Sequence, residues 1–267
     1  MARVLNENRE LCEIKCEPYK RMIKEAFERE KEILASIEAN PAGAAYKKLN
    51  LCDEMIGCAT YYIMINNLTV ELVNTKDNDA LNDARKMLYK AIIYLEEVVS
   101  NVIDALQSDM EDKLAAISEA PIDKRFNLVR KLGLAISLLI DAFGDNSKWK
   151  MSFVELQGRF ATVSKNLLDL KKACKDYFDP NSPDYDNSVL YIRLIRKLYD
   201  QSATAYRDKY ELATHRIDDM RNAILFLSGG RRVAIALGEA EAAEEIKKKA
   251  GVWKQKVEAD QKKGIAK

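Results

Sequence analysis

The residues of this chain best suited to chemistry are five cysteines and a single histidine. Four of the cysteines form two close pairs, Cys12 with Cys16 and Cys52 with Cys58. Four converging thiolates would make a zinc site. If the helices that carry the two pairs form a hairpin, however, Cys12 lies beside about residue 70, several turns away from Cys52. We therefore interpret the cysteines as small core side chains, and no metal or cofactor is predicted.

A nucleophilic system of the Ser-His-Asp or Cys-His kind would have to use His215, the only histidine. Glu211 precedes it by four residues, and Asp218 and Asp219 follow it by three and four. The chain has no Glu-x-x-His pair, so the usual ligand set of a di-iron helical bundle is missing. His215 also lies close to Ala213, which belongs to an apolar seam. It is expected on the flank of a helix, and no catalytic residue is predicted.

Two loops carry groups that bind ions in other proteins. One gathers oxygen-bearing side chains, but it lacks the glycine and the terminal glutamate of an EF-hand loop. The other, Ser228-Gly229-Gly230-Arg231-Arg232, offers backbone N–H groups and two guanidinium groups to a phosphate. It follows a helix rather than a strand, so we interpret it as a hinge. The oxygen-bearing residues, interpreted as turn and cap formers, are Asp176, Asp179, Asn181, Asp184 and Asp186.

The most suggestive set consists of arginines and tyrosines late in the chain. Guanidinium forks and phenol hydroxyls on a grooved helical surface bind phosphorylated or acidic peptides. Several of the tyrosines fall on apolar seams, which favours packing over binding. The set is Tyr191, Arg193, Arg196, Tyr199, Tyr206, Arg207, Tyr210, Arg216 and Arg221. From this region and the segment after it, the predicted partner-binding residues are Arg193, Arg196, Arg207, Arg231, Arg232 and Trp253.

The composition favours long exposed helices. Of the 267 residues 32% are charged, whereas glycines and prolines number only 10 and 5, and sheets and tight turns consume glycine. The net charge of +1 excludes the global basic field of a nucleic-acid binder. Residues 1–143 carry 19 basic and 24 acidic side chains, a balance of −5, and residues 144–267 carry 24 and 18, a balance of +6. This asymmetry either attracts copies head to tail or reflects two solvated surfaces of different composition.

No signal peptide or membrane-spanning segment is predicted. Residues 1–20 are studded with charged side chains, and the most apolar stretch, Leu132–Ile140, is too short to cross a bilayer. Five cysteines in a chain of this kind indicate a reducing compartment. The expected location is the cytoplasm.

Apolar seams with steps of three and four residues predict helices over 4–39, 44–73, 79–118 and 121–143. The second and fourth carry two seams each, so both are expected to be buried on two sides. Asn66 and Asn67 fall within the second helix, where a buried amide must find partners. The third helix would be an unbroken rod of roughly 60 Å. Pro18 either kinks the first helix or marks its ordered start.

Two long limbs, folded back on each other, are predicted to follow. The first runs from Trp149 to Tyr177 and the second from Ser182 to Leu227, and their seams are typical of a helix gripped along its length. Gly144–Ser147 supplies a C-cap followed by an N-cap for the first limb. A last helix is expected from Arg231 to about Lys263 after a break at Gly229-Gly230. Its narrow apolar stripe predicts that Trp253 docks on this chain or another.

The expected fold is all-α, an elongated antiparallel helical bundle or stacked array of six to seven long helices. Residues 1–119 and 121–227 would form two helical units, and 231–267 a C-terminal arm. Long seams and a nearly histidine-free chain argue against an enzyme. The predicted function is a non-enzymatic cytoplasmic scaffold or adaptor that binds protein partners and forms a homo-oligomer. The alternatives are a peptide-binding adaptor with an Arg/Tyr groove, and a membrane-surface module, for which only residues 231–256 begin to supply a basic face.

Overall fold

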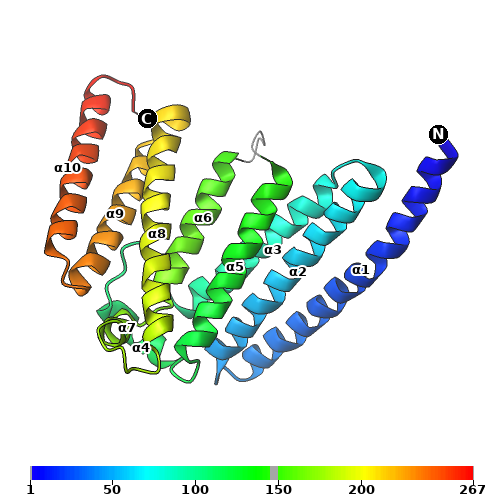
Figure 1. The fold of residues 1–267 in the computed structure, drawn as a ribbon, viewed down its shortest axis with the longest axis horizontal. Helices are drawn as coiled ribbons and strands as arrows, with labels where there is room; N and C mark the ends of the chain where they lie inside the picture. The colour runs from blue at the N-terminus through cyan, green and yellow to red at the C-terminus, as the bar shows by residue number, and fades with distance from the viewer. Residues whose placement is uncertain (1, 145–149, 267) are drawn as a thin grey trace. The chain divides into compact units, whose positions relative to one another are not determined.

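The computed structural model describes residues 2–144 and 150–266, and in that part of the chain every regular element is a helix. The predicted all-α class is confirmed (Figure 1). The chain divides into two compact units: unit 1 comprises residues 1–98 and 128–149, and unit 2 comprises residues 99–127 and 150–267. These boundaries differ from those expected from the sequence. None of the described helices combines enough length with enough apolar character to cross a bilayer.

Unit 1 begins with a hairpin of two long helices, α1 (Ala2–Ala39) and α2 (Ala44–Val73), which lie side by side in Figure 1. Both agree closely with the predicted ranges. The Sγ atom of Cys12 lies 3.7 Å from Oγ1 of Thr69, so the predicted register of the hairpin is confirmed to within one residue. Pro18 lies inside α1, and the helix continues through it.

α2 is the centre of unit 1. It packs against α1 and against α3 (Asn78–Val98), and Leu51 and Cys52 on it are fully buried. Asn66 is 2% exposed, and its Oδ1 accepts a hydrogen bond from the backbone N–H of Asp77 at 3.0 Å. The buried amide therefore fixes the turn between α2 and α3, because it gives that N–H its partner.

The predicted third helix does not continue to residue 118. α3 ends at Val98, and the chain then runs irregularly to Gln107. A 3₁₀ turn (Ser108–Met110) and the short helix α4 (Glu111–Ala115) follow. The prediction of one unbroken rod is wrong, and the reason lies in unit 2.

Side chains of unit 2 hold the carbonyl groups that a continued helix would use. The Nδ2 of Asn166 donates to the carbonyls of Ser100 and Val102 at 2.9 and 3.0 Å. The hydroxyl of Tyr199 donates to the carbonyl of Ile103 at 2.8 Å. These bonds replace helical ones at residues 99–107, and apolar periodicity alone does not reveal such competition.

Unit 2 is built mainly from helices. The predicted helix over 121–143 is confirmed as α5, whose residues as far as Asn127 belong to unit 2 and the remainder to unit 1. In Figure 1, α8, α9 and α10 lie side by side. The helices are α5 (Ile122–Phe143), α6 (Lys150–Asn166), α7 (Leu170–Tyr177), α8 (Tyr185–Lys209), α9 (Ile217–Ala236) and α10 (Ala240–Lys262).

Both predicted limbs are interrupted. The first breaks at residues 167–169, where the side chain of Asp169 accepts a hydrogen bond from the backbone N–H of Lys172 at 3.0 Å and caps α7. The second breaks in a π-helical turn, Tyr210–Thr214, which is followed by His215 in the left-handed conformation with φ 52°. The expected start of the first limb at Trp149 and its cap within residues 145–147 lie outside the described residues.

The expected break at Gly229-Gly230 is also wrong, because α9 passes through both glycines to Ala236. A Cβ atom on Gly229 would lie 2.4 Å from Cε1 of Tyr199. This glycine therefore allows α8 and α9 to approach closely. The chain turns instead at Gly238, where φ is 73°.

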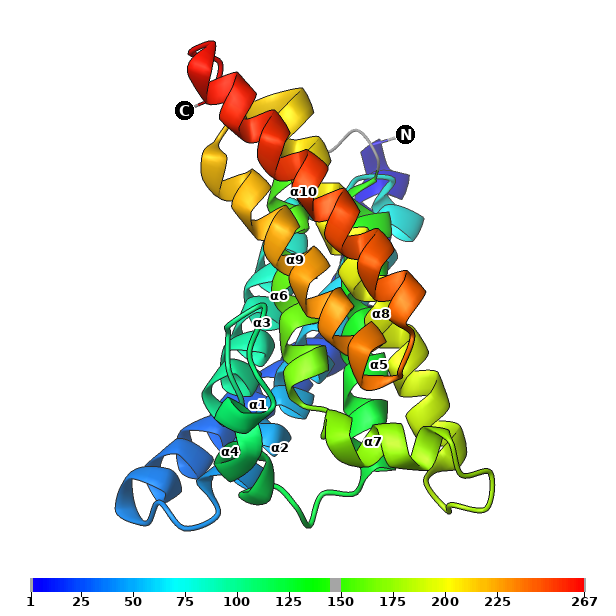
Figure 2. The ribbon, with the colours of Figure 1, turned by 90° about the vertical axis from the view of Figure 1, so that its left-hand side faces the viewer.

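The last helix docks within unit 2. α10 packs along α9, as both views show (Figures 1 and 2). Trp253 and Val257 are 6% and 8% exposed. The hydroxyl of Tyr210 donates to the carboxylate of Asp260 at 2.9 Å. The C-terminal helix thus finds its partner in the same chain.

Candidate functional site

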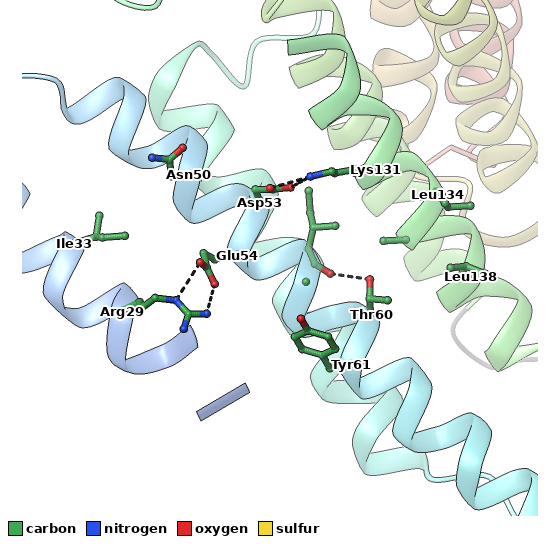
Figure 3. A pocket seen from close by; sticks show the side chains of 13 residues that line it. Arg29, Ile33, Asn50, Asp53, Glu54, Thr60, Tyr61, Lys131, Leu134 and Leu138 are labelled. Atoms are coloured by element: carbon green, nitrogen blue, oxygen red, sulfur yellow. Dashed lines mark hydrogen bonds and ion pairs between the residues drawn. The ribbon is translucent and has the colours of Figure 1, made fainter. Parts of the chain in front are cut away.

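A groove of about 740 Å³ lies in unit 1, between the α1–α2 hairpin and the part of α5 that belongs to this unit (Figure 3). α2 contributes Asp53, Gly57 and Thr60, spaced by four and three residues. α5 contributes Lys131, Leu134 and Leu138, spaced by three and four. Each set shares one face of its helix, so two helical ridges line the groove.

The floor and one wall of the groove are apolar. Ile56 and Ala135 are 5% and 2% exposed at the floor. On the wall, Leu134 and Leu138 are 62% and 40% exposed. Single exposed leucines are ordinary on a protein surface, but two that line the same groove form a contiguous patch.

Gly57 leaves the middle of α2 open. A Cβ atom built on it would meet nothing within 4 Å. Glycine in a helix interior destabilises the helix by about 1 kcal/mol relative to alanine. Among the residues that the structure describes, no packing contact offsets that cost at Gly57, in contrast to Gly229.

Ion pairs connect the helices around the groove. Figure 3 shows Arg29 of α1 facing Glu54 of α2, with nitrogen–oxygen distances of 3.1 and 2.9 Å. The hydrogen bonds to Glu54 raise the pKa of the Arg29 guanidinium. From α5, the Nζ of Lys131 lies 2.9 Å from both carboxylate oxygens of Asp53. These side chains are between 31% and 59% exposed, so each pair adds little stability.

The lining of the groove combines apolar side chains with charged and hydroxyl-bearing ones. No thiol or imidazole belongs to the described lining. The hydroxyl of Thr60 donates to the carbonyl of Ile56 at 3.0 Å and is occupied within its own helix. Tyr61 lies with its ring centroid 6.1 Å from that of Tyr19. The groove therefore offers apolar surface beside charges that are paired with one another.

The predicted partner-binding residues lie in unit 2, and most of them are already paired there. Arg196 bonds Glu239 through two nitrogen–oxygen contacts of 2.9 and 2.7 Å. Arg207 bonds Glu211 at 3.1 and 3.0 Å. Arg193 is exposed on α8.

The remaining predicted residues follow the same pattern. Arg232 makes a two-point bond to Asp104, and Arg231 lies 3.9 Å from Glu244. Trp253 is buried, with the charged groups of Arg207 and Lys249 at 5.6 and 5.1 Å from its ring centroid. Unit 2 thus supplies its own acidic partners to these cations.

The tyrosines of the predicted Arg/Tyr groove belong mainly to the core of unit 2. Tyr191, Tyr199, Tyr206 and Tyr210 are all buried. Tyr191 donates to the carbonyl of Ser164 at 2.9 Å. Burial, together with the bond to Asp260, raises the pKa of Tyr210 to about 12. These phenols therefore act as hydrogen-bonding core residues.

The remaining candidates do not assemble into a reactive site. His215 lies with its ring 5.9 Å from that of Tyr210. In the loop between α7 and α8, the hydroxyl of Ser182 donates to Asp176 at 2.8 Å. The backbone N–H of Asn181 donates to Asp179 at 3.0 Å, and both bonds are typical of turns. Among the described residues, no three histidine, cysteine or acidic side chains converge as metal ligands.

Two features of the sequence are consistent with the groove, and both involve residues outside the apolar seams. Leu134 and Leu138 fall outside both apolar seams of α5, so they are unaccounted-for leucines on a helix that already buries two faces. Gly57 interrupts a helix with strong apolar seams. Neither signal says which helices face each other, and that relation is what defines the groove.

Comparison with known proteins places the chain without naming an activity. No curated protein and no solved structure matches it. One family model covers residues 8–261, nearly the whole chain. The protein therefore belongs to the TP0443 family.

Proposed function

We propose that the protein is a non-enzymatic adaptor or scaffold that binds a helical segment of a partner protein in the groove of unit 1. The observation that carries the proposal is the open space at Gly57. This glycine belongs to the lining of the groove, as do the exposed leucines of α5, and no side chain in the described part of the chain fills the space above it.

The shape of the groove suits a helix. Two ridges with helical spacing leave a furrow into which a third helix packs by its own ridges. A glycine on the furrow lets the incoming backbone approach closely. The partner segment needs apolar side chains at helical spacing to cover Leu134 and Leu138, as in other helix-in-groove complexes. Polar residues flanking them would lie beside the existing Lys131–Asp53 and Arg29–Glu54 pairs.

The Arg/Tyr groove is the less favoured site for this function. An acidic peptide would have to displace Glu239 from Arg196 and Glu211 from Arg207, which are already bonded at two points each. The gain from a new ion pair would be offset by the loss of an existing one. The groove of unit 1 demands no such loss for its apolar contacts. We place this adaptor in the cytoplasm, with self-association through another surface as part of the proposal.

The decisive experiment is photocrosslinking in the native host. A benzophenone amino acid at Leu134 should give a discrete adduct with one partner protein. The adduct should disappear in Gly57→Leu, which fills the furrow, and persist in Gly251→Leu. Gly251 is a matched control, because it is also a helical glycine with nothing within 4 Å of an added Cβ, but on α10. The same probe at Leu190, which is 51% exposed on α8, should give no such adduct.

The cross-linked segment, mapped by mass spectrometry, can then be tested as a synthetic peptide. It should gain helical circular dichroism on binding, and Gly57→Leu should weaken its affinity at least about tenfold. An adduct that survives Gly57→Leu would contradict the proposal. An adduct with a second copy of the chain would also contradict it, and would assign the groove to self-association.

A further inference from the structure

A second hollow, of about 280 Å³, lies within unit 2 and is independent of the groove. It is bounded by the irregular segment after α3, the end of α6 and the later part of α9. Its inner wall is apolar, with Met110 and Leu168 each 3% exposed. Leu106 and Ile235 stand at its mouth, 42% and 52% exposed. The cavity is therefore open to solvent on one side and apolar within.

Lys165 is the unusual residue of this cavity, because it is only 7% exposed. Its Nζ donates to the carbonyl of Ala105 at 2.6 Å and to Oδ1 of Asn166 at 3.3 Å. Both acceptors are neutral. In the described part of the chain no carboxylate lies within ion-pair distance of this ammonium. A buried cation without an anionic partner is costly, and burial lowers the pKa of Lys165 to about 8.

The other charged groups at the cavity do not neutralise Lys165. Arg232 lines the cavity, but its guanidinium is bonded at two points to Asp104. Asp169, whose carboxylate accepts hydrogen bonds from the N–H of Lys172 and, at 3.4 Å, from the side-chain amide of Gln107, does not belong to the described lining of the cavity. Because the charges of Arg232 and Asp104 cancel, the positive charge of Lys165 is not balanced within the cavity.

We propose that this cavity binds a small monocarboxylate with an apolar tail, whose carboxylate accepts a hydrogen bond from Lys165 while the tail lies against Met110 and Leu168. One unbalanced positive charge matches a singly charged anion and would compensate only half of a phosphate dianion. The apolar inner wall stabilises a hydrocarbon tail by removing it from water. The bound carboxylate supplies the partner that the buried ammonium lacks.

Octanoate is the probe for the test, with octanol as the uncharged analogue, both titrated calorimetrically into the full-length protein. Octanoate should bind saturably and at least about tenfold more tightly than octanol. The affinity for octanoate should fall about tenfold between pH 7 and 9, because Lys165 loses its proton over this range. The carboxylate of octanoate and the guanidinium group of Arg232 keep their charges over the same range. Octanol binding should not depend on pH.

Two variants separate the charge from the cavity. Lys165→Met should abolish both the preference for octanoate and its pH dependence. Ile235→Trp blocks the mouth while keeping Lys165, and it should abolish binding of both ligands. Leu225→Trp is the matched control on α9, where the leucine is 41% exposed and lies away from the cavity, and it should bind normally.

Circular dichroism establishes that each variant remains folded, and the Ile235→Trp result stands even if Lys165→Met unfolds. Equal affinity for octanoate and octanol would overturn the proposal. Octanoate binding that survives Lys165→Met, or no saturable binding of octanoate to the native protein, would overturn it as well.

Discussion

Gly57 of unit 1 and two helical glycines of unit 2 differ in what lies next to them. In unit 2, a Cβ on Gly158 would lie 2.6 Å from Cε2 of Tyr206, and one on Gly229 would lie 2.4 Å from Cε1 of Tyr199. In unit 1, Gly57 has open space above it. Glycine therefore makes room for a tyrosine of the chain itself at residues 158 and 229 and leaves open space at residue 57, as it also does at Gly251 of unit 2. What distinguishes Gly57 is that it lines a groove beside the exposed Leu134 and Leu138, and this supports the proposed binding of a partner helix in unit 1.

The largest effect expected from this comparison is that of Gly229→Ala. The added methyl must push Tyr199 away and disturb its bond to the carbonyl of Ile103. Overpacking of this kind should lower the free energy of unfolding by about 2 to 3 kcal/mol, measured by urea denaturation at pH 7. Gly230→Ala is the control, since its Cβ would lie 3.9 Å from Cβ of Tyr199. Equal effects at both glycines would contradict the close-packing role.

A second effect of about 2 kcal/mol concerns the charge buried in unit 2. Because the pKa of Lys165 in the folded protein, about 8, is below its unfolded value, its burial penalty is complete below pH 8 and fades as the pH rises. The free energy of unfolding should therefore rise by about 2 kcal/mol between pH 7.5 and 9.5 relative to Lys165→Met. Burial raises the pKa values of Cys52 and Cys58, so these thiols lower the free energy of unfolding as the pH rises over the same range. The quantity to measure is therefore the difference between the native protein and Lys165→Met. Parallel curves would show that the ammonium of Lys165 is not penalised by burial.

Tyr199→Phe should have a smaller effect, about 1 to 2 kcal/mol. The ring of Tyr199 remains to pack against Gly229 and against Phe226, whose ring centroid is 5.3 Å away. Only the hydrogen bond to the carbonyl of Ile103 is lost, which leaves that acceptor without this donor. Amide hydrogen exchange should show increased opening confined to residues 99–107 and their neighbours. Destabilisation as large as that of Gly229→Ala would mean that the bond, and not the close approach, holds the helices.

The sequence predicted the parts of this fold that depend on one helix at a time. The ranges of α1, α2 and α5 and the register between Cys12 and Thr69 follow from apolar periodicity and a single turn. The irregular segment 99–107 could not be predicted, because the donors that hold its carbonyls, Asn166 and Tyr199, come from helices far along the chain.

The candidate site could not be predicted from the sequence for the same reason. The sequence predicted Arg196 and Arg207 as cations available to a partner. In the folded protein they are bonded to Glu239 and Glu211. A pair such as Gly229-Gly230 looks the same in the sequence whether it breaks a helix or lets a tyrosine pack against it. At Gly57 the informative feature is that no described side chain packs against the glycine, and only the structure reveals it.

The smallest effect sharpens the comparison most, because its sign is opposite. Gly57→Ala adds a methyl in open space and replaces the poorer helix former, so it should raise the free energy of unfolding by about 1 kcal/mol. The same methyl narrows the furrow, so affinity for the partner helix should fall, by less than in Gly57→Leu. Gly251→Ala should stabilise equally and leave binding unchanged. A variant at residue 57 that is more stable and binds as well as the native protein would show that the furrow is unused space. Loss of binding together with a gain in stability would show that the protein keeps this glycine for its partner, at the expense of its own helix.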